Sequence, residues 1–467
     1  MMNGWRMLGL SAVLASHLTE ASSLTRLALP LVLGQMAHAG VGFTDTLMVG
    51  RLGGLELAGV ALGSSLYFFA FILCSGILYS VAPSVSQAFG AGRERDALHA
   101  ARQGIWLALF FALPVIVLLF LAEGLLLSTG QDPEVAAIAA NYLRVIAPGF
   151  LPMLLTVALR GFLEGKGDTR PLMFILLLGL GVKIALNSVL LTGGGPFPAL
   201  GVNGAAISSV AVYTVEFLAA ALYVSRKYRS LQLFGALGWP HAPQIVELIR
   251  VGVPIGLTLG FETGLFTLTA FLMGTLGGPE LAAHQVALQS AGMAFNIPLG
   301  LALATSVRVG YSVGRADRAG AALAGRVGVL TSMLAMTVTA LIFALVPEQV
   351  ASLFLDAADP QNAEVMALAV SFLGFAAMFQ LVDGVQVTAS GALRGYKDTR
   401  VPMLASLFSY WVFGLGTSLW LLYGVGMGGA GLWIGLVAGL AMAAVLLSIR
   451  LVWRGRQPVG PIFSVPD

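Results

Sequence analysis

Long apolar runs follow one another along the chain, separated by short polar segments. Each run is about as long as the roughly 20 residues that cross a bilayer as a helix, and none alternates in the way a barrel strand does. The pattern predicts an all-α membrane protein with about twelve transmembrane helices. Their expected positions are 27–50, 57–82, 104–122, 136–159, 171–192, 203–225, 246–274, 282–307, 324–347, 364–392, 401–424 and 428–452.

The composition agrees with a membrane protein. Of 467 residues, 58% are hydrophobic and 10% are charged, and the mean hydropathy is +0.89, whereas soluble domains average about 25% charged residues. This excludes a soluble enzyme, and the single cysteine, Cys74, excludes a disulfide scaffold. A net charge of +3 gives no sign of a nucleic-acid partner. No phosphate-binding loop occurs, so we expect no ATP, no cofactor and no enzymatic activity.

Basic residues occur in every second loop, and acidic residues predominate in the others. The apolar residues 7–15 are followed by polar residues 16–25 without a clear cleavage site, which favours an N-terminal segment rather than a signal peptide. Because cytoplasmic loops carry the excess of Lys and Arg, we expect both termini to be cytoplasmic, in a bacterial-type cell membrane.

The chain also repeats itself at about half its length. Pro30 precedes Leu52–Ala58 by the same separation at which Pro254 precedes Leu276–Ala282. Gly92-Arg93 is matched with Gly314-Arg315, and Leu159–Phe162 with Leu393–Tyr396. The repeat predicts two six-helix bundles of the same orientation. The expected divisions are an N-lobe at 1–225, a linker at 226–243 and a C-lobe at 244–467.

These motifs resemble the MATE family of multidrug and toxin extrusion transporters over nearly the whole chain. The residues that carry the resemblance are Pro30 with Gly42–Gly50, Ala283–Val286 including Gln285, and Leu393–Gly395 with Asp398–Arg400. Glu262 and Asp383 resemble the pair of acids that is typical of the NorM-like branch of this family. The resemblance implies export of amphipathic, often cationic drugs in exchange for H⁺ or Na⁺ by alternating access, in a lipid bilayer. We expect a monomer.

Two acids inside predicted spans are candidates for ion coupling, because a charge at the bilayer centre costs about 3 kcal/mol or more. Glu262 lies about 18 Å along its helix from Arg250, and Asp383 about 17 Å from Arg394, so their depths are similar. Thr258, Gln380 and Gln386 are expected to add polar groups on the same faces. The resemblance implies cation binding by this pair, with Na⁺ possible, aided by an aromatic hydroxyl one turn before Asp383. That position is Phe379 here, so the choice between H⁺ and Na⁺ is open.

A third acid, Asp45, is expected at the same depth as Asn187 and Ser209, about 8 to 9 Å from the outer helix ends. These groups could form one hydrogen-bonded cluster, either for coupling or to hold three helices together. His38 is the repeat counterpart of Glu262 and could titrate or bond between helices. Lys183 is expected to pair with Glu216 structurally. Arg144 is expected to snorkel to the interface or to cap its helix.

Other candidates are weaker. Pro30 and Pro254 each remove a backbone hydrogen bond and could bend their helices, although prolines are also tolerated near helix ends. An adaptable aromatic cleft for substrate could be lined by Phe43, Phe261, Phe266, Met293 and Phe295, whose alternative role is to face lipid.

Two alternative functions stay open. A flippase for a lipid-linked precursor would want a cationic cleft for pyrophosphate, whereas the charges predicted inside the membrane are mostly acidic. A non-transporting scaffold or receptor would not need several buried carboxylates.

Overall fold

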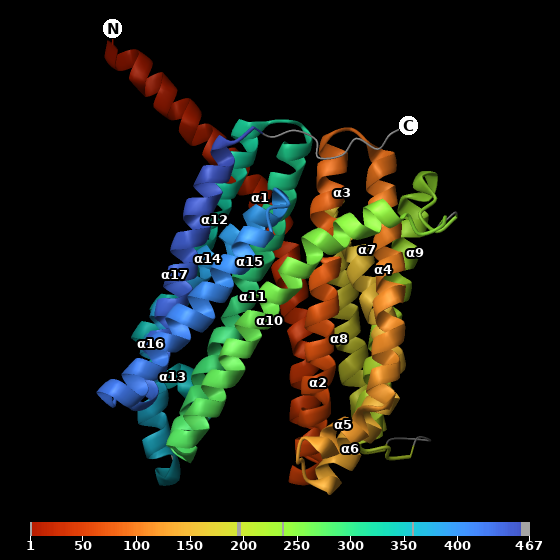
Figure 1. The fold of residues 1–467 in the computed structure, drawn as a ribbon, viewed down its shortest axis with the longest axis vertical. Helices are drawn as coiled ribbons and strands as arrows, with labels where there is room; N and C mark the ends of the chain where they lie inside the picture. The colour runs from red at the N-terminus through yellow and green to blue at the C-terminus, as the bar shows by residue number, and fades with distance from the viewer. Residues whose placement is uncertain (1, 194–197, 236–237, 357–358, 459–467) are drawn as a thin grey trace. The chain divides into compact units, whose positions relative to one another are not determined.

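The computed structural model describes residues 2–193, 198–235, 238–356 and 359–458, and within these ranges it is helical without strands. Twelve stretches are long and apolar enough to cross a membrane, so the predicted all-α fold with twelve spans is confirmed. The helices are α1 (Met2–Val49), α2 (Gly54–Leu78), α3 (Val81–Gly90), α4 (Glu94–Phe120), α5 (Ala122–Ser128), α6 (Pro133–Ile146), α7 (Phe150–Lys166), α8 (Arg170–Leu190), α9 (Val202–Lys227), α10 (Ala242–Leu276), α11 (Gly278–Gly314), α12 (Arg318–Leu345), α13 (Pro347–Ala351), α14 (Ala363–Gly395), α15 (Arg400–Leu407), α16 (Leu415–Leu419) and α17 (Gly428–Arg456) (Figure 1).

Shorter elements complete the chain. They are the 3₁₀ turns η1 (Ala147–Gly149), η2 (Arg229–Leu231) and η3 (Pro360–Asn362), and the π-helical segments η4 (Phe408–Gly414) and η5 (Trp420–Val425). Segment η4 lies inside the eleventh span, between α15 and α16. A π-helical turn is uncommon and often occurs at functional sites.

The chain forms two compact units. Unit 1 comprises 1–32 and 257–467, and unit 2 comprises 33–256. Both divisions fall inside helices, α1 and α10, each of which contributes its first part to one unit and its remainder to the other. Figure 1 shows α10 as a continuous helix. The lobe boundaries at 225 and 243 stay a prediction based on the sequence repeat.

Close helix packing explains why the first part of α10 belongs to unit 2. A Cβ atom added to Gly76 on α2 would lie 2.3 Å from the Cα atom of Gly256 on α10. Real side chains do not approach so closely, so the two backbones meet here because both residues are glycine.

The helix ends fix the register of the repeat and correct one sequence match. After α7, the N–H of Asp168 donates to the carbonyl of Leu163, and after α14 the N–H of Asp398 donates to that of Leu393. Gly167 and Lys397 have positive φ angles of 81° and 57° in these matching caps. The match of Leu159–Phe162 with Leu393–Tyr396 is therefore wrong by one helical turn, and Leu163 is the counterpart of Leu393.

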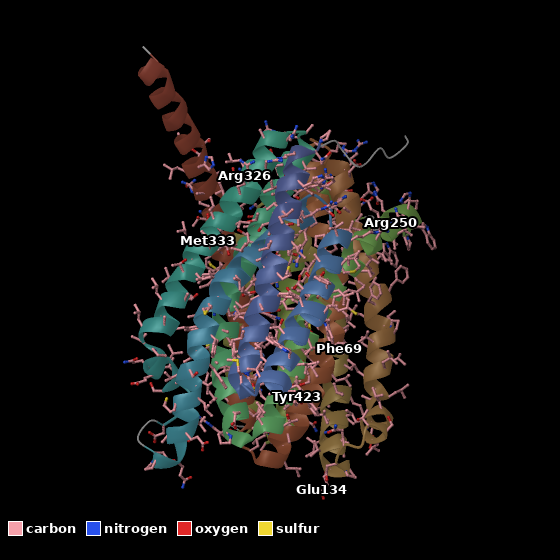
Figure 2. All side chains as sticks on the ribbon, turned by 60° about the vertical axis from the view of Figure 1, so that its left-hand side comes forward. Phe69, Glu134, Arg250, Arg326, Met333 and Tyr423 are labelled. Carbon is pink, nitrogen blue, oxygen red and sulfur yellow. The ribbon has the colours of Figure 1, made fainter. Side chains whose placement is uncertain are left out.

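A basic and an acidic residue lie toward opposite ends of the helices of unit 2. Arg250 lies toward one end of this unit and Glu134 at the other (Figure 2). The arrangement agrees with the alternation of basic and acidic loops in the sequence. The side of the membrane on which each end lies stays a prediction.

Candidate functional site

Asp45, Asn187 and Ser209 meet in unit 2, as their common depth predicted. They project from α1, α8 and α9, respectively, and all three are buried. The Asn187 amide donates to Asp45 Oδ1 at 2.9 Å, and the Ser209 hydroxyl donates to Oδ2 at 3.3 Å. The cluster joins three helices around one carboxylate.

Lys183 completes this cluster, which the sequence analysis did not predict. Its ammonium lies 2.6 Å from Asp45 Oδ1, and its side chain is fully buried. The predicted pair of Lys183 with Glu216 is wrong: Glu216 packs against Gly179, and its Oε1 has no hydrogen-bond partner within the described residues. Lys183 and Asn187 are four residues apart and so share one face of α8, which is a signal that could have identified the partner.

Glu262 on α10 and Asp383 on α14 are the two buried acids among the described residues of unit 1. Glu262 is 8% exposed and Asp383 is 0% exposed. Both oxygens of Asp383, and both amide atoms of Gln380 one turn earlier, lack hydrogen-bond partners among the residues that the structure describes. The same is true of the Gln386 Oε1. Since buried polar groups are normally hydrogen-bonded, a run of unsatisfied groups on one helix is unusual.

An aromatic hydroxyl accompanies the two acids, although Phe379 supplies none. Tyr410 in η4 is 0% exposed, and it lies close enough to Glu262 and Asp383 for both charges to act on its hydroxyl. Tyr410 thus brings a hydroxyl from another helix into the neighbourhood of the two acids, although this hydroxyl forms no hydrogen bond within the described residues. No sequence signal identified Tyr410, because it lies on a separate element, η4, which follows α14 after a turn.

Aromatic rings form a cluster in unit 1, and two of them project from the helices that carry the acids. The ring of Phe379 lies 5.9 Å from that of Phe266 and 6.3 Å from that of Trp433, and Trp433 in turn lies 5.6 Å from His284. His284 is fully buried, and both of its ring nitrogens lack partners within the described ranges.

The remaining predicted residues are dispersed. Thr258 is buried, His38 lies near Phe71 with a ring separation of 6.2 Å, and Gln285 is exposed. Among the predicted cleft residues, Phe43 and Met293 are more than half exposed, whereas Phe261, Phe266 and Phe295 are partly buried. Their proposed contact with substrate stays a prediction.

Two further charged groups have specific partners. Arg144 forms an ion pair with Glu123 on α5, and its snorkelling to the interface or capping of its helix stays a prediction. Arg160 on α7, buried in unit 2, donates to Gln35 at 2.7 Å and lies 3.5 Å from Glu164. This pair lies near one end of α7 and is distinct from the Asp45 cluster.

The MatE family model matches the chain twice, over residues 30–189 and 254–420. The two matches begin at Pro30 and Pro254, the same residues that begin the sequence repeat. The family model therefore matches each half of the chain separately.

Curated relatives match most of the chain. A probable multidrug resistance protein NorM of Deinococcus radiodurans is 41% identical over 96% of this chain and 98% of its own length. Another of Rhizobium meliloti is 40% identical over 91% of both. The multidrug resistance protein NorM of Burkholderia vietnamiensis is 38% identical over 96% of both chains.

Solved structures share the fold. The eukaryotic MATE transporter AtDTX14 matches with a TM-score of 0.83 at 23% identity, over 93% of this chain and 96% of that one. An outward-facing multidrug resistance MATE family transporter of the MOP superfamily matches with a TM-score of 0.86 at 21% identity, over the same shares. Together with the double family match and the NorM relatives, this shows that the chain is a multi-pass membrane protein of the MATE family, whose members are transporters and not enzymes.

Proposed function

We propose that this chain is a secondary active multidrug efflux antiporter. It exports amphipathic, often cationic compounds in exchange for H⁺ or Na⁺ by alternating access. The names of the relatives support the substrate class, since three of them are multidrug resistance proteins. The cell membrane is the proposed location, with both termini cytoplasmic, and neither ATP nor a bound cofactor takes part.

The observation that carries the coupling proposal is the buried acid pair of unit 1. Asp383 has two carboxylate oxygens without hydrogen-bond partners among the described residues, and Gln380 beside it has an unpartnered amide oxygen. Tyr410 adds a hydroxyl close to both Asp383 and Glu262. Such a set of oxygens suits a proton or a hard monovalent cation, because hard cations prefer oxygen ligands.

Charge neutralisation provides the coupling. When a proton or Na⁺ binds to Glu262 and Asp383, the site loses negative charge and attracts a cationic drug less strongly. Loss of the ion restores the negative charge and the attraction. The same two carboxylates therefore favour either the ion or the drug, as antiport requires.

The test is transport by the purified chain in proteoliposomes. A fluorescent organic cation is followed while H⁺ and Na⁺ gradients are imposed separately. Glu262→Gln and Asp383→Asn keep the shapes of the side chains but remove their charges. We expect each to reduce gradient-driven transport strongly, and the double variant to reduce it to the level of empty liposomes.

The matched control is Glu364→Gln, a carboxamide replacement at an exposed position on the same helix as Asp383. It should transport at the level of the unaltered protein. Undiminished gradient-driven transport by the Glu262→Gln/Asp383→Asn variant would refute the coupling proposal. The gradient that drives the unaltered protein identifies the coupling ion.

A further inference from the structure

The ammonium of Lys183 lies in a cage of oxygen atoms in unit 2. Its Nζ atom is 2.6 Å from Asp45 Oδ1, 2.6 Å from Ser209 Oγ, 2.8 Å from Ser208 Oγ and 3.0 Å from the carbonyl oxygen of Ala205. An ammonium has three N–H donors, so four oxygens at these distances use its whole hydrogen-bonding capacity. The lysine contacts the cage in the way a small monovalent cation contacts its ligands.

Neutral neighbours hold the cage in place. The Asn187 amide donates to Asp45 Oδ1, and its own oxygen accepts from Ser208. The carbonyl oxygen of Ala205 on α9 lies within hydrogen-bond distance of both hydroxyls and is an alternative acceptor for the single proton of Ser208 and for that of Ser209. The oxygens therefore keep their positions through contacts that do not involve Lys183.

The cage holds one carboxylate, and Lys183 neutralises it. A second cation at this site would meet the ammonium at close range, where two like charges repel by about 4 kcal/mol at 4 Å and an effective dielectric constant near 20. It would also find the oxygens already engaged. Asp383 in unit 1 differs, because no hydrogen-bond partner lies against its carboxylate within the described residues.

We propose that Lys183 is a tethered counter-cation that closes the Asp45 site to inorganic cations. The coupling ion is then taken by Glu262 and Asp383 alone, so this inference rests on the proposed function and assigns the coupling to one unit. Asp45, which the sequence analysis placed among the coupling residues, instead forms a permanent ion pair that joins α1 to α8.

The cage has the size of a large monovalent site. Its oxygens lie 2.6 to 3.0 Å from the nitrogen, whereas Ca²⁺ takes oxygens at roughly 2.3–2.6 Å. Removal of the ammonium alone should therefore admit an ion such as Rb⁺. Lys183→Met does this, because the methionine side chain ends where the lysine ammonium begins and preserves the apolar stem.

The experiment measures equilibrium binding of radioactive Rb⁺ to the purified full chain in detergent, with choline chloride holding the ionic strength constant. Glu262→Gln/Asp383→Asn serves as the background, so that unit 1 contributes no binding. Addition of Lys183→Met to this background should create one saturable Rb⁺ site per chain. Further addition of Asp45→Asn should remove it.

The comparisons separate the two proposals. Gradient-driven transport lost between the unaltered chain and the Glu262→Gln/Asp383→Asn variant tests the proposed function, whereas Rb⁺ binding gained on addition of Lys183→Met tests the tethered cation. No gain of Rb⁺ binding, or a gain that survives Asp45→Asn, would overturn the inference about Lys183.

A second variant tests the same inference if Lys183→Met does not fold. Asp45→Asn in the otherwise unaltered chain should leave Na⁺ and Rb⁺ binding at the original level, because Asp45 takes no ion in the presence of Lys183. Loss of ion binding in this variant would overturn the inference, and unchanged binding supports it.

Discussion

Asp168, in the turn between α7 and α8, holds the C-terminal end of α9 in unit 2. Its Oδ2 atom accepts hydrogen bonds from Tyr228 at 2.6 Å, Lys227 at 2.7 Å and Tyr223 at 2.8 Å. Three donors from one helix end thus converge on a single carboxylate oxygen. The charge of Asp168 should therefore contribute measurably to the stability of unit 2.

The perturbation is Asp168→Asn, which keeps an acceptor oxygen but removes the charge. Hydrogen bonds to charged groups contribute about 1.5–3 kcal/mol and neutral ones about 0.5–1.5 kcal/mol, so each tyrosine bond should lose about 1 kcal/mol. The Lys227 side chain is 47% exposed, so its ion pair adds only about 0.5 kcal/mol. The expected loss of unfolding free energy is about 2 to 3 kcal/mol at pH 7.

The effect should depend on pH with a defined sign. Burial raises the pKa of Asp168, but the hydrogen bonds from Lys227, Tyr228 and Tyr223 together outweigh it and hold the pKa below the ordinary value of 3.8. A carboxyl whose pKa is lowered in the folded state stabilises the protein above its unfolded pKa. This stabilisation is lost as the pH falls through the lower, folded-state pKa.

The assay is thermal unfolding of the detergent-solubilised protein by intrinsic fluorescence, from pH 7 down to pH 3. The control is Asp398→Asn in unit 1, since Asp398 accepts one side-chain hydrogen bond, from Arg450 at 2.7 Å, and should lose only about 1 kcal/mol. Equal stabilities of Asp168→Asn and the unaltered protein at pH 7 would refute the reasoning. A difference that does not shrink toward pH 3 would show that the ionised carboxylate is not its source.

Two further predictions concern packing and buried charge in unit 2. Gly252→Ala places a Cβ atom 2.3 Å from the carbonyl oxygen of Ile77 and should lower the free energy of unfolding by about 1–3 kcal/mol. The control, Gly181→Ala, places a Cβ atom where no other atom lies within 4 Å, so it should be tolerated. Equal unfolding temperatures for the two variants would contradict this prediction. Arg160→Met leaves the buried Glu164 without its cation and should cost about 3–5 kcal/mol, and adding Glu164→Gln should recover much of the loss. Strictly additive losses in the same unfolding assay would show that the two side chains do not interact.

Much of the architecture could be predicted from one-dimensional patterns. Apolar runs of bilayer length gave the twelve spans, because every backbone polar group in a bilayer must be satisfied within a helix. The repeated segments after Pro30 and Pro254 gave two related halves, and the family model finds the same two starting points. The acids inside these runs were identified because buried charge is costly and therefore rare.

The partners of those acids were predicted only in part. Residue spacing gives depth along a helix at 1.5 Å per residue, and this was sufficient to group Asp45 with Asn187 and Ser209. Depth does not give the direction in which a side chain points or which helices are neighbours. Lys183 was therefore assigned to Glu216, which lies at a similar depth, although its ammonium contacts Asp45.

The sequence by itself determined that this protein lies in a membrane, how many spans it has and which few carboxylates lie inside those spans. Tertiary structure decided what surrounds each carboxylate, because the rotation and packing of helices depend on contacts between residues far apart in the chain. It gave Asp45 a lysine from α8, and it placed Tyr410 from η4 beside Glu262 and Asp383. Of the three acids predicted to couple ions, Asp45 is thus neutralised by a lysine of the same chain, and Glu262 and Asp383 are proposed to bind the coupling ion.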